Sequence, residues 1–120
     1  MARMPQVYEK YPDESLWATV SFKTRLLNGD LLTGTPTVTE CSGTLYFSNI
    51  QINTSTMILA SGTDYEETVS SGEAVQFLVA SGDAGSSYDM VVSCSTDGNV
   101  APSQDMTNVA QIDVIRTTKN

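Results

Sequence analysis

The sequence predicts an all-β protein built as an antiparallel sandwich. Ser and Thr supply 29 of the 120 residues, and both are poor in helix interiors, whereas Thr suits strands and Ser suits turns. Short runs of alternating apolar and polar residues recur along the chain, with turn residues between them. Their spacing, about 8–12 residues, is typical of an immunoglobulin-like sandwich, here of about seven strands. A small antiparallel barrel is the alternative architecture.

The length suits one domain. We place this domain at residues 15–120, after an extended N-terminal arm of residues 1–14. Pro5 and Pro12 bracket the short run QVYEKY in the arm. Proline disfavours helical geometry in the residue before it, so we expect an extended segment that adds to a sheet edge or lies on a neighbouring molecule.

The clearest strands show unbroken alternation of apolar residues. In residues 16–22 the apolar face leaves Trp17 on the opposite face, either covered there or exposed as a contact residue. Pro36 lacks an amide donor, which makes residues 35–41 an expected edge strand. The same alternation predicts strands at residues 73–80, 88–94 and 109–116. Short apolar pieces without a readable register lie at 44–47, 49–53 and 57–60, and a short strand is expected at 65–69.

Two local features have specific structural interpretations. Tyr88 enters its strand from a Gly-bearing loop, which predicts a tyrosine corner whose hydroxyl bonds to upstream backbone. Cys41 and Cys94 are expected to be buried free thiols, because the chain lacks the apolar leader of a secreted protein. A disulfide between the sheets is the alternative.

The charge distribution argues against several partners. Six Lys and Arg face fourteen Asp and Glu, for a net charge of −8. No basic residue occurs between Arg25 and Arg116, a stretch that holds most of the carboxylates. Binding to nucleic acid requires clustered Lys and Arg, and anionic membranes attract the same residues. We therefore expect no nucleic-acid partner and no membrane partner.

The inventory of reactive groups favours a protein that is not an enzyme. The chain contains no His, which is the commonest general base and metal ligand. The carboxylates are scattered over different turns, with no pattern of a catalytic pair. The two Asp-containing loops at residues 81–83 and 96–99 lack the ligand spacing of a calcium site. We therefore expect no catalytic residues, no metal site and no cofactor.

Contact residues are expected near the N-terminal arm. Aromatic side chains are favoured anchors of protein interfaces, which singles out Tyr8, Tyr11 and Trp17. Lys23 and Arg25 are basic residues next to an otherwise acidic body, a pattern that suits head-to-tail contacts between copies.

Several short motifs resemble those of small tailed-bacteriophage virion proteins. They are KYPDE at residues 10–14, VSF at 20–22, LLNGDL at 26–31 and VQFLVASGDAGSSY at 75–88. The resembling proteins are fibre–tail adaptors and immunoglobulin-like modules of the neck or head. The resemblance carries over no catalytic residue. It implies a structural protein made in the host cytoplasm and located in the virion, with other phage structural proteins and further copies of itself as partners.

Within that class the resemblance favours an adaptor of the neck or tail fibres, and capsid decoration is the alternative. A second class remains open on the residues alone. A β-sandwich that exposes Trp17 is also suited to stack a sugar, as in a carbohydrate- or receptor-binding module.

Overall fold

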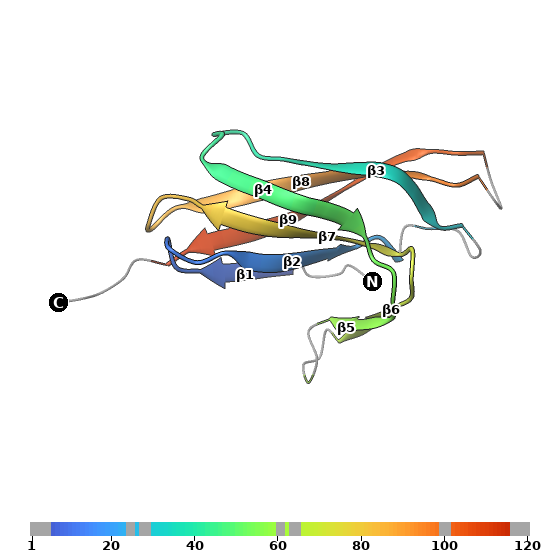
Figure 1. Cartoon of the computed structure of the whole chain (residues 1–120), viewed down its shortest axis with the longest axis horizontal. Helices are drawn as coiled ribbons and strands as arrows, with labels where there is room; N and C mark the ends of the chain where they lie inside the picture. The colour runs from blue at the N-terminus through green and yellow to red at the C-terminus, as the bar shows by residue number, and fades with distance from the viewer. Residues whose placement is uncertain are drawn as a thin grey trace.

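The structure is a computed structural model that describes residues 6–23, 26, 30–59, 62, 66–98 and 102–115. These residues form nine strands that run largely along the long axis of the molecule (Figure 1). The strands are β1 (Gln6–Lys10), β2 (Leu16–Ser21), β3 (Leu32–Thr39), β4 (Leu45–Ile52), β5 (Met57–Leu59), β6 (Glu67–Val69), β7 (Ala74–Ser81), β8 (Ser87–Thr96) and β9 (Asp105–Val114).

Seven of the strands form two stacked sheets, which confirms the predicted sandwich. One sheet has the order β1-β9-β8-β3 and the other the order β2-β7-β4. This arrangement of strands is that of an immunoglobulin-like domain whose first strand has joined the sheet of the last strands. The pairs are antiparallel except β1 with β9, which is parallel. The remaining strands, β5 and β6, form a hairpin inserted between β4 and β7.

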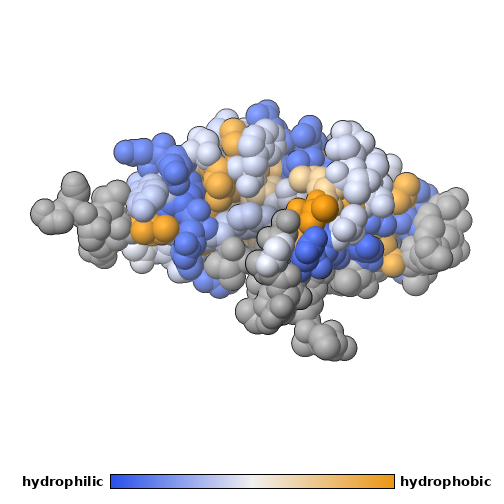
Figure 2. Space-filling model, turned by 90° about the horizontal axis from the view of Figure 1, so that it is seen from below, coloured by the Kyte–Doolittle hydropathy of each residue, from blue (hydrophilic) through white to orange (hydrophobic). Residues whose placement is uncertain are grey.

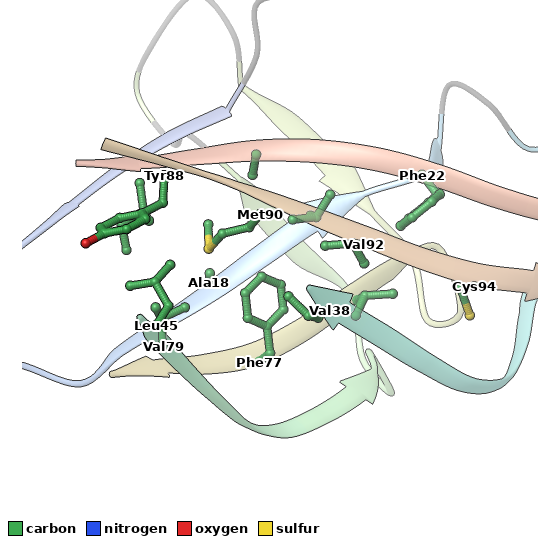
Figure 3. Close-up of a cluster of buried hydrophobic side chains, with 14 of the residues drawn as sticks. Ala18, Phe22, Val38, Leu45, Phe77, Val79, Tyr88, Met90, Val92 and Cys94 are labelled. Atoms are coloured by element: carbon green, nitrogen blue, oxygen red, sulfur yellow. The ribbon is translucent and has the colours of Figure 1, made fainter. Parts of the chain in front are cut away.

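The core lies between the two sheets, on the faces that the alternation predicts. Met90 and Val92 of β8 point toward the opposite sheet, where Ala18 and Phe77 lie (Figure 3). Phe77 packs edge-on against Phe47, with ring centroids 5.7 Å apart. The predicted inward residues of the strands around 16–22, 73–80, 88–94 and 109–116 are buried, apart from the half-buried Leu16.

Two strands depart from regular alternation, and both were only partly predicted. The pieces expected at 44–47 and 49–53 are a single strand, β4, whose pairing with β7 shifts between Ser48 and Gln51. Asn49 lies in this shift with a φ of 52°. Such a left-handed residue breaks the two-residue period, which hides the strand in the sequence. The edge position expected from Pro36 is correct, and β3 begins earlier, at Leu32.

The described part of the expected arm, residues 6–14, contains β1, which adds to the edge of a sheet of its own chain. Its Tyr8 hydroxyl donates a hydrogen bond to the Thr19 carbonyl at 2.7 Å and accepts one from the Thr19 amide at 2.8 Å. Asn108 of β9 donates to the Ser21 carbonyl at 2.8 Å. These side chains satisfy main-chain groups of β2 on the side away from β7, so they link the two sheets at this edge.

The cysteines are both free. Cys94 is buried, and burial raises the pKa of its thiol. The expectation of a buried thiol is wrong for Cys41, which is exposed. The physical reason is that β3 ends at Thr39, so Cys41 falls in the loop before β4 and not on the inner face of a strand.

The tyrosine corner is confirmed. The Asp83 amide donates to the Tyr88 hydroxyl at 2.9 Å, across the loop between β7 and β8. Tyr88 is buried against the core, and its hydroxyl therefore fixes the path of the loop from inside the protein.

Replacing Tyr88 with Phe should lower the free energy of unfolding by about 1 kcal/mol, the typical net value of one hydrogen bond. Chemical denaturation measures the change. The matched control is Tyr46→Phe, which removes the hydroxyl of an exposed tyrosine and should have almost no effect. Equal losses in the two variants would contradict a structural role for the Tyr88 hydroxyl.

Candidate functional site

The aromatic residues expected to make contacts have different environments. Tyr8 is half-buried and packs against the core, with its hydroxyl bound to β2. Tyr11 is exposed just after β1, and Trp17 is 50% exposed on the outer face of β2. Of these three, Tyr8 serves to close the sandwich, whereas Tyr11 and Trp17 expose their rings to solvent.

Of the two basic residues expected to make contacts, Lys23 is described and bonds its own chain. Lys23 donates from its Nζ to the Thr68 carbonyl at 2.7 Å, and therefore holds β6 of its own chain. Ser21, two residues earlier, donates to the Glu67 carboxylate at 3.1 Å. Arg25 lies outside the described residues. The end of β2 thus anchors the β5–β6 hairpin through polar contacts on one side.

The β5–β6 hairpin projects from the sandwich (Figure 1). One face of the hairpin packs on the start of β7, where Leu59, Val69 and Ala74 form a small separate core flanked by Met57. The other face carries Ile58, which is 55% exposed. From below, the surface shows separate hydrophobic patches among hydrophilic residues (Figure 2).

A buried amide holds the base of the hairpin. Asn53 is 1% exposed, and its Oδ1 accepts hydrogen bonds from the main-chain amides of Gly72, Glu73 and Ala74, at 3.0, 3.1 and 3.0 Å. Its Nδ2 donates to the carbonyls of Ser55 and Ser70. We call Asn53 with residues 72–74 the Asn53 node. Five hydrogen bonds to one side chain fix where the hairpin leaves β4 and where it enters β7.

The three-stranded sheet is free of charge. None of the residues of β2 (LWATVS), β4 (LYFSNIQI) or β7 (AVQFLVAS) is charged, in a chain that is 17% charged. In contrast, the four-stranded sheet carries Glu9, Asp89, Asp105 and Asp113. The two outer faces of the sandwich therefore differ in their electrostatic character.

The outer face of the uncharged sheet carries two exposed aromatic rings. Trp17 of β2 is opposite Leu78 of β7, and Tyr46 of β4 is opposite Ala80, two residues further along β7. Tyr46 is 63% exposed. We call this surface the uncharged face; its members are Trp17, Tyr46, Ser48, Gln51, Gln76, Leu78 and Ala80. Sequence reasoning singled out Trp17 and missed Tyr46. The signal that could have identified Tyr46 is its place between Leu45 and Phe47, because alternation along a strand puts it on the face opposite these two core residues.

Lys10 is the largest buried polar side chain, and it does not serve a surface contact. It is 1% exposed. Burial lowers the pKa of its ammonium below the ordinary 10.5, and the nearby Glu14 and Asp13 offset part of that effect. The Nζ atom donates to three main-chain carbonyls, those of Ser81 at 2.7 Å, Tyr11 at 2.8 Å and Pro12 at 3.4 Å.

Two further findings concern the described part of the chain. No three Asp, Glu or Cys side chains gather there in a group that would hold a metal ion. The same residues contain no helix of the length and apolarity that a membrane crossing requires.

No protein-family model matches the chain, and a search of curated proteins found no match.

Replacing Asn53 with Ala should destabilise the protein by about 3 kcal/mol, because it removes five hydrogen bonds that a buried side chain makes to the main chain. It should also expose the hairpin to limited proteolysis. The matched control is Asn108→Ala, which loses the hydrogen bond to the Ser21 carbonyl and an exposed one from the Val109 amide, and should cost about 1 kcal/mol. Intact protease resistance of the hairpin in Asn53→Ala would contradict the role of the node.

Replacing Lys10 with Met should destabilise the fold by about 2 kcal/mol, because three main-chain carbonyls lose a charged donor. Lys23→Met is the control, and its exposed side chain should contribute less than about 1 kcal/mol.

The pH dependence of the Lys10 effect has a definite sign. Since the pKa of Lys10 is lowered on folding, the unfolded chain binds the proton more tightly. The stability of the wild type relative to Lys10→Met should therefore rise as the pH approaches 10.5. Denaturation curves at neutral and alkaline pH measure this difference, and a fall with pH would contradict the assignment.

Proposed function

We propose that the protein is a non-enzymatic structural subunit of a tailed-phage virion, which joins larger components through protein–protein contacts. The favoured position is an adaptor at the neck or tail fibres. The short motifs at residues 10–14, 20–22, 26–31 and 75–88 support this class. The observation that carries the contact function is the projecting β5–β6 hairpin.

The hairpin has the properties of an assembly element. Among the described residues β5 and β6 pair only with each other, and Lys23 bonds a carbonyl of β6, so the outer edge of β5 is the one that an extended segment of a neighbour can join. The hairpin also presents Ile58 away from its own small core. Because the Asn53 node and Lys23 hold its base, docking requires little ordering of the hairpin base, which lowers the entropic cost of association.

The charge of the four-stranded sheet bears on the choice of neighbour. Hydrogen bonds from Gln111 and Ser87 lower the pKa of Asp113, which therefore stays ionised in mildly acidic solution. Together with Asp89 and Asp105 it makes this outer face acidic. Neighbouring subunits that meet this face are expected to be neutral or basic, with electrostatics acting on the rate and orientation of docking.

Copy number separates an adaptor from capsid decoration. An adaptor is present in a small number set by the symmetry of the tail axis, whereas a decoration protein scales with the area of the shell. Mass spectrometry of purified particles gives the number, and a cryo-EM map gives the position. Absence of the chain from the particles would reject the proposal.

The substitution Ile58→Ser should reduce the binding of the purified chain to particles that lack it by about tenfold, because it removes an exposed apolar anchor. Its stability should stay close to that of the wild type. Val109→Ser is the matched control, since Val109 is also an exposed aliphatic residue on a strand, but belongs to the four-stranded sheet and not to the hairpin. If the two variants bind equally well, the hairpin is not the contact element.

A further inference from the structure

We infer that the uncharged face is a binding site for an uncharged oligosaccharide. This function goes beyond the structural role proposed above and does not depend on it, because the site is on the three-stranded sheet and not on the hairpin. The site consists of two exposed rings, Trp17 and Tyr46, with Leu78 and Ala80 between them and the amide side chains of Gln76 and Gln51 beside them.

The chemistry of the face fits a neutral sugar chain. Aromatic rings offer a negative π face to the C–H groups of a sugar ring, and amide and hydroxyl side chains bond its hydroxyls. The face supplies both kinds of group and no charge. A polyanion would meet the repulsion of a chain with a net charge of −8, whereas a neutral ligand would not.

The positions of the two rings fit an elongated ligand. Trp17 and Tyr46 are on the two edge strands of the sheet, with β7 between them. The residues of β7 that they oppose, Leu78 and Ala80, are two positions apart. Sheet geometry separates their backbone positions by about 10 Å across the strands and about 7 Å along them. One short sugar chain that crosses the strands obliquely therefore contacts both rings with different sugar units.

The size of the face argues against a second copy or another protein as its occupant. The hairpin covers the end of the face at Ala74. The open part spans three strands and residues 76–80 of β7, roughly 14 Å by 17 Å, or on the order of 250 Å². Stable protein interfaces use about 800 Å² on each partner. The open part suits a ligand of a few sugar rings.

Thr19 and Ser21 limit the site at the same end as the hairpin, because Ser21 is opposite Ala74. Both residues belong to β2 and are buried, and Ser21 bonds the Glu67 carboxylate of the hairpin. The ligand is therefore confined to the end of the sheet that carries the rings, where Ser48 and Leu78 lie in the same row as Trp17.

Isothermal titration of the full chain tests the site, with cellohexaose, laminarihexaose and maltohexaose as neutral probes and a galacturonate hexamer as the acidic probe. At least one neutral probe should bind, and the acidic probe should not. Trp17→Ala and Tyr46→Ala should each weaken binding by about tenfold, and Trp17→Phe should retain part of the affinity. Tyr11→Ala, which truncates an exposed aromatic residue in the loop between β1 and β2 and not among the seven residues of the face, is the matched control and should bind like the wild type.

Three results would overturn the inference. The first is no binding of any neutral probe by the folded wild-type chain, and the second is equal affinity in Tyr11→Ala and the two ring variants. The third is a concentration-dependent dimer in sedimentation that Trp17→Ala abolishes, which would assign the face to a second copy. Unfolding curves of every variant check that it is as stably folded as the wild type, so that a loss of affinity reflects binding and not misfolding. Incorporation into particles, measured on the same variants, separates this site from the structural role, because the ring variants should still assemble.

Discussion

The buried amide of Asn53 is the interaction on which the arrangement of the other elements depends. Its Oδ1 holds the turn that starts β7, and the same turn receives main-chain contacts from both sheets. The Phe22 amide donates to the Glu73 carbonyl and the Leu32 amide donates to the Gly72 carbonyl, each at 2.8 Å. The end of β2, the start of β3 and the base of the hairpin therefore meet at one point. A buried polar network of this kind is stabilising only when every member is paired, so it specifies a single geometry.

That geometry separates two surfaces of different chemistry. At one end of the three-stranded sheet the hairpin projects, anchored by the Asn53 node and Lys23. At the other end the sheet is open and carries Trp17 and Tyr46 without a charge. The hairpin covers only the part of the outer face next to Ala74. One small domain thereby offers an edge for a protein neighbour and a flat aromatic face for a neutral ligand, and neither obstructs the other.

The sequence was sufficient where local pattern determines structure. Unbroken alternation located the inner faces of β2, β7, β8 and β9, and the loop before Tyr88 identified its corner. It was insufficient where the decisive partners are distant in the chain. The left-handed Asn49 interrupts β4, so the sequence showed two short pieces and not one strand. The role of Asn53 depends on a turn about twenty residues later, and Tyr8 bonds a strand of the opposite sheet. Neither bond leaves a local pattern.

Amide hydrogen exchange at Gly72, Glu73 and Ala74 tests the role of the Asn53 node most directly, because these amides donate to its side chain. If the node fixes the hairpin to the sandwich, the three amides exchange as slowly as that of Phe77 in the middle of β7. In Asn53→Ala they should exchange faster by a factor larger than the loss of global stability explains. Exchange in the wild type as fast as that of an exposed turn amide such as Gly98 would contradict a rigid node.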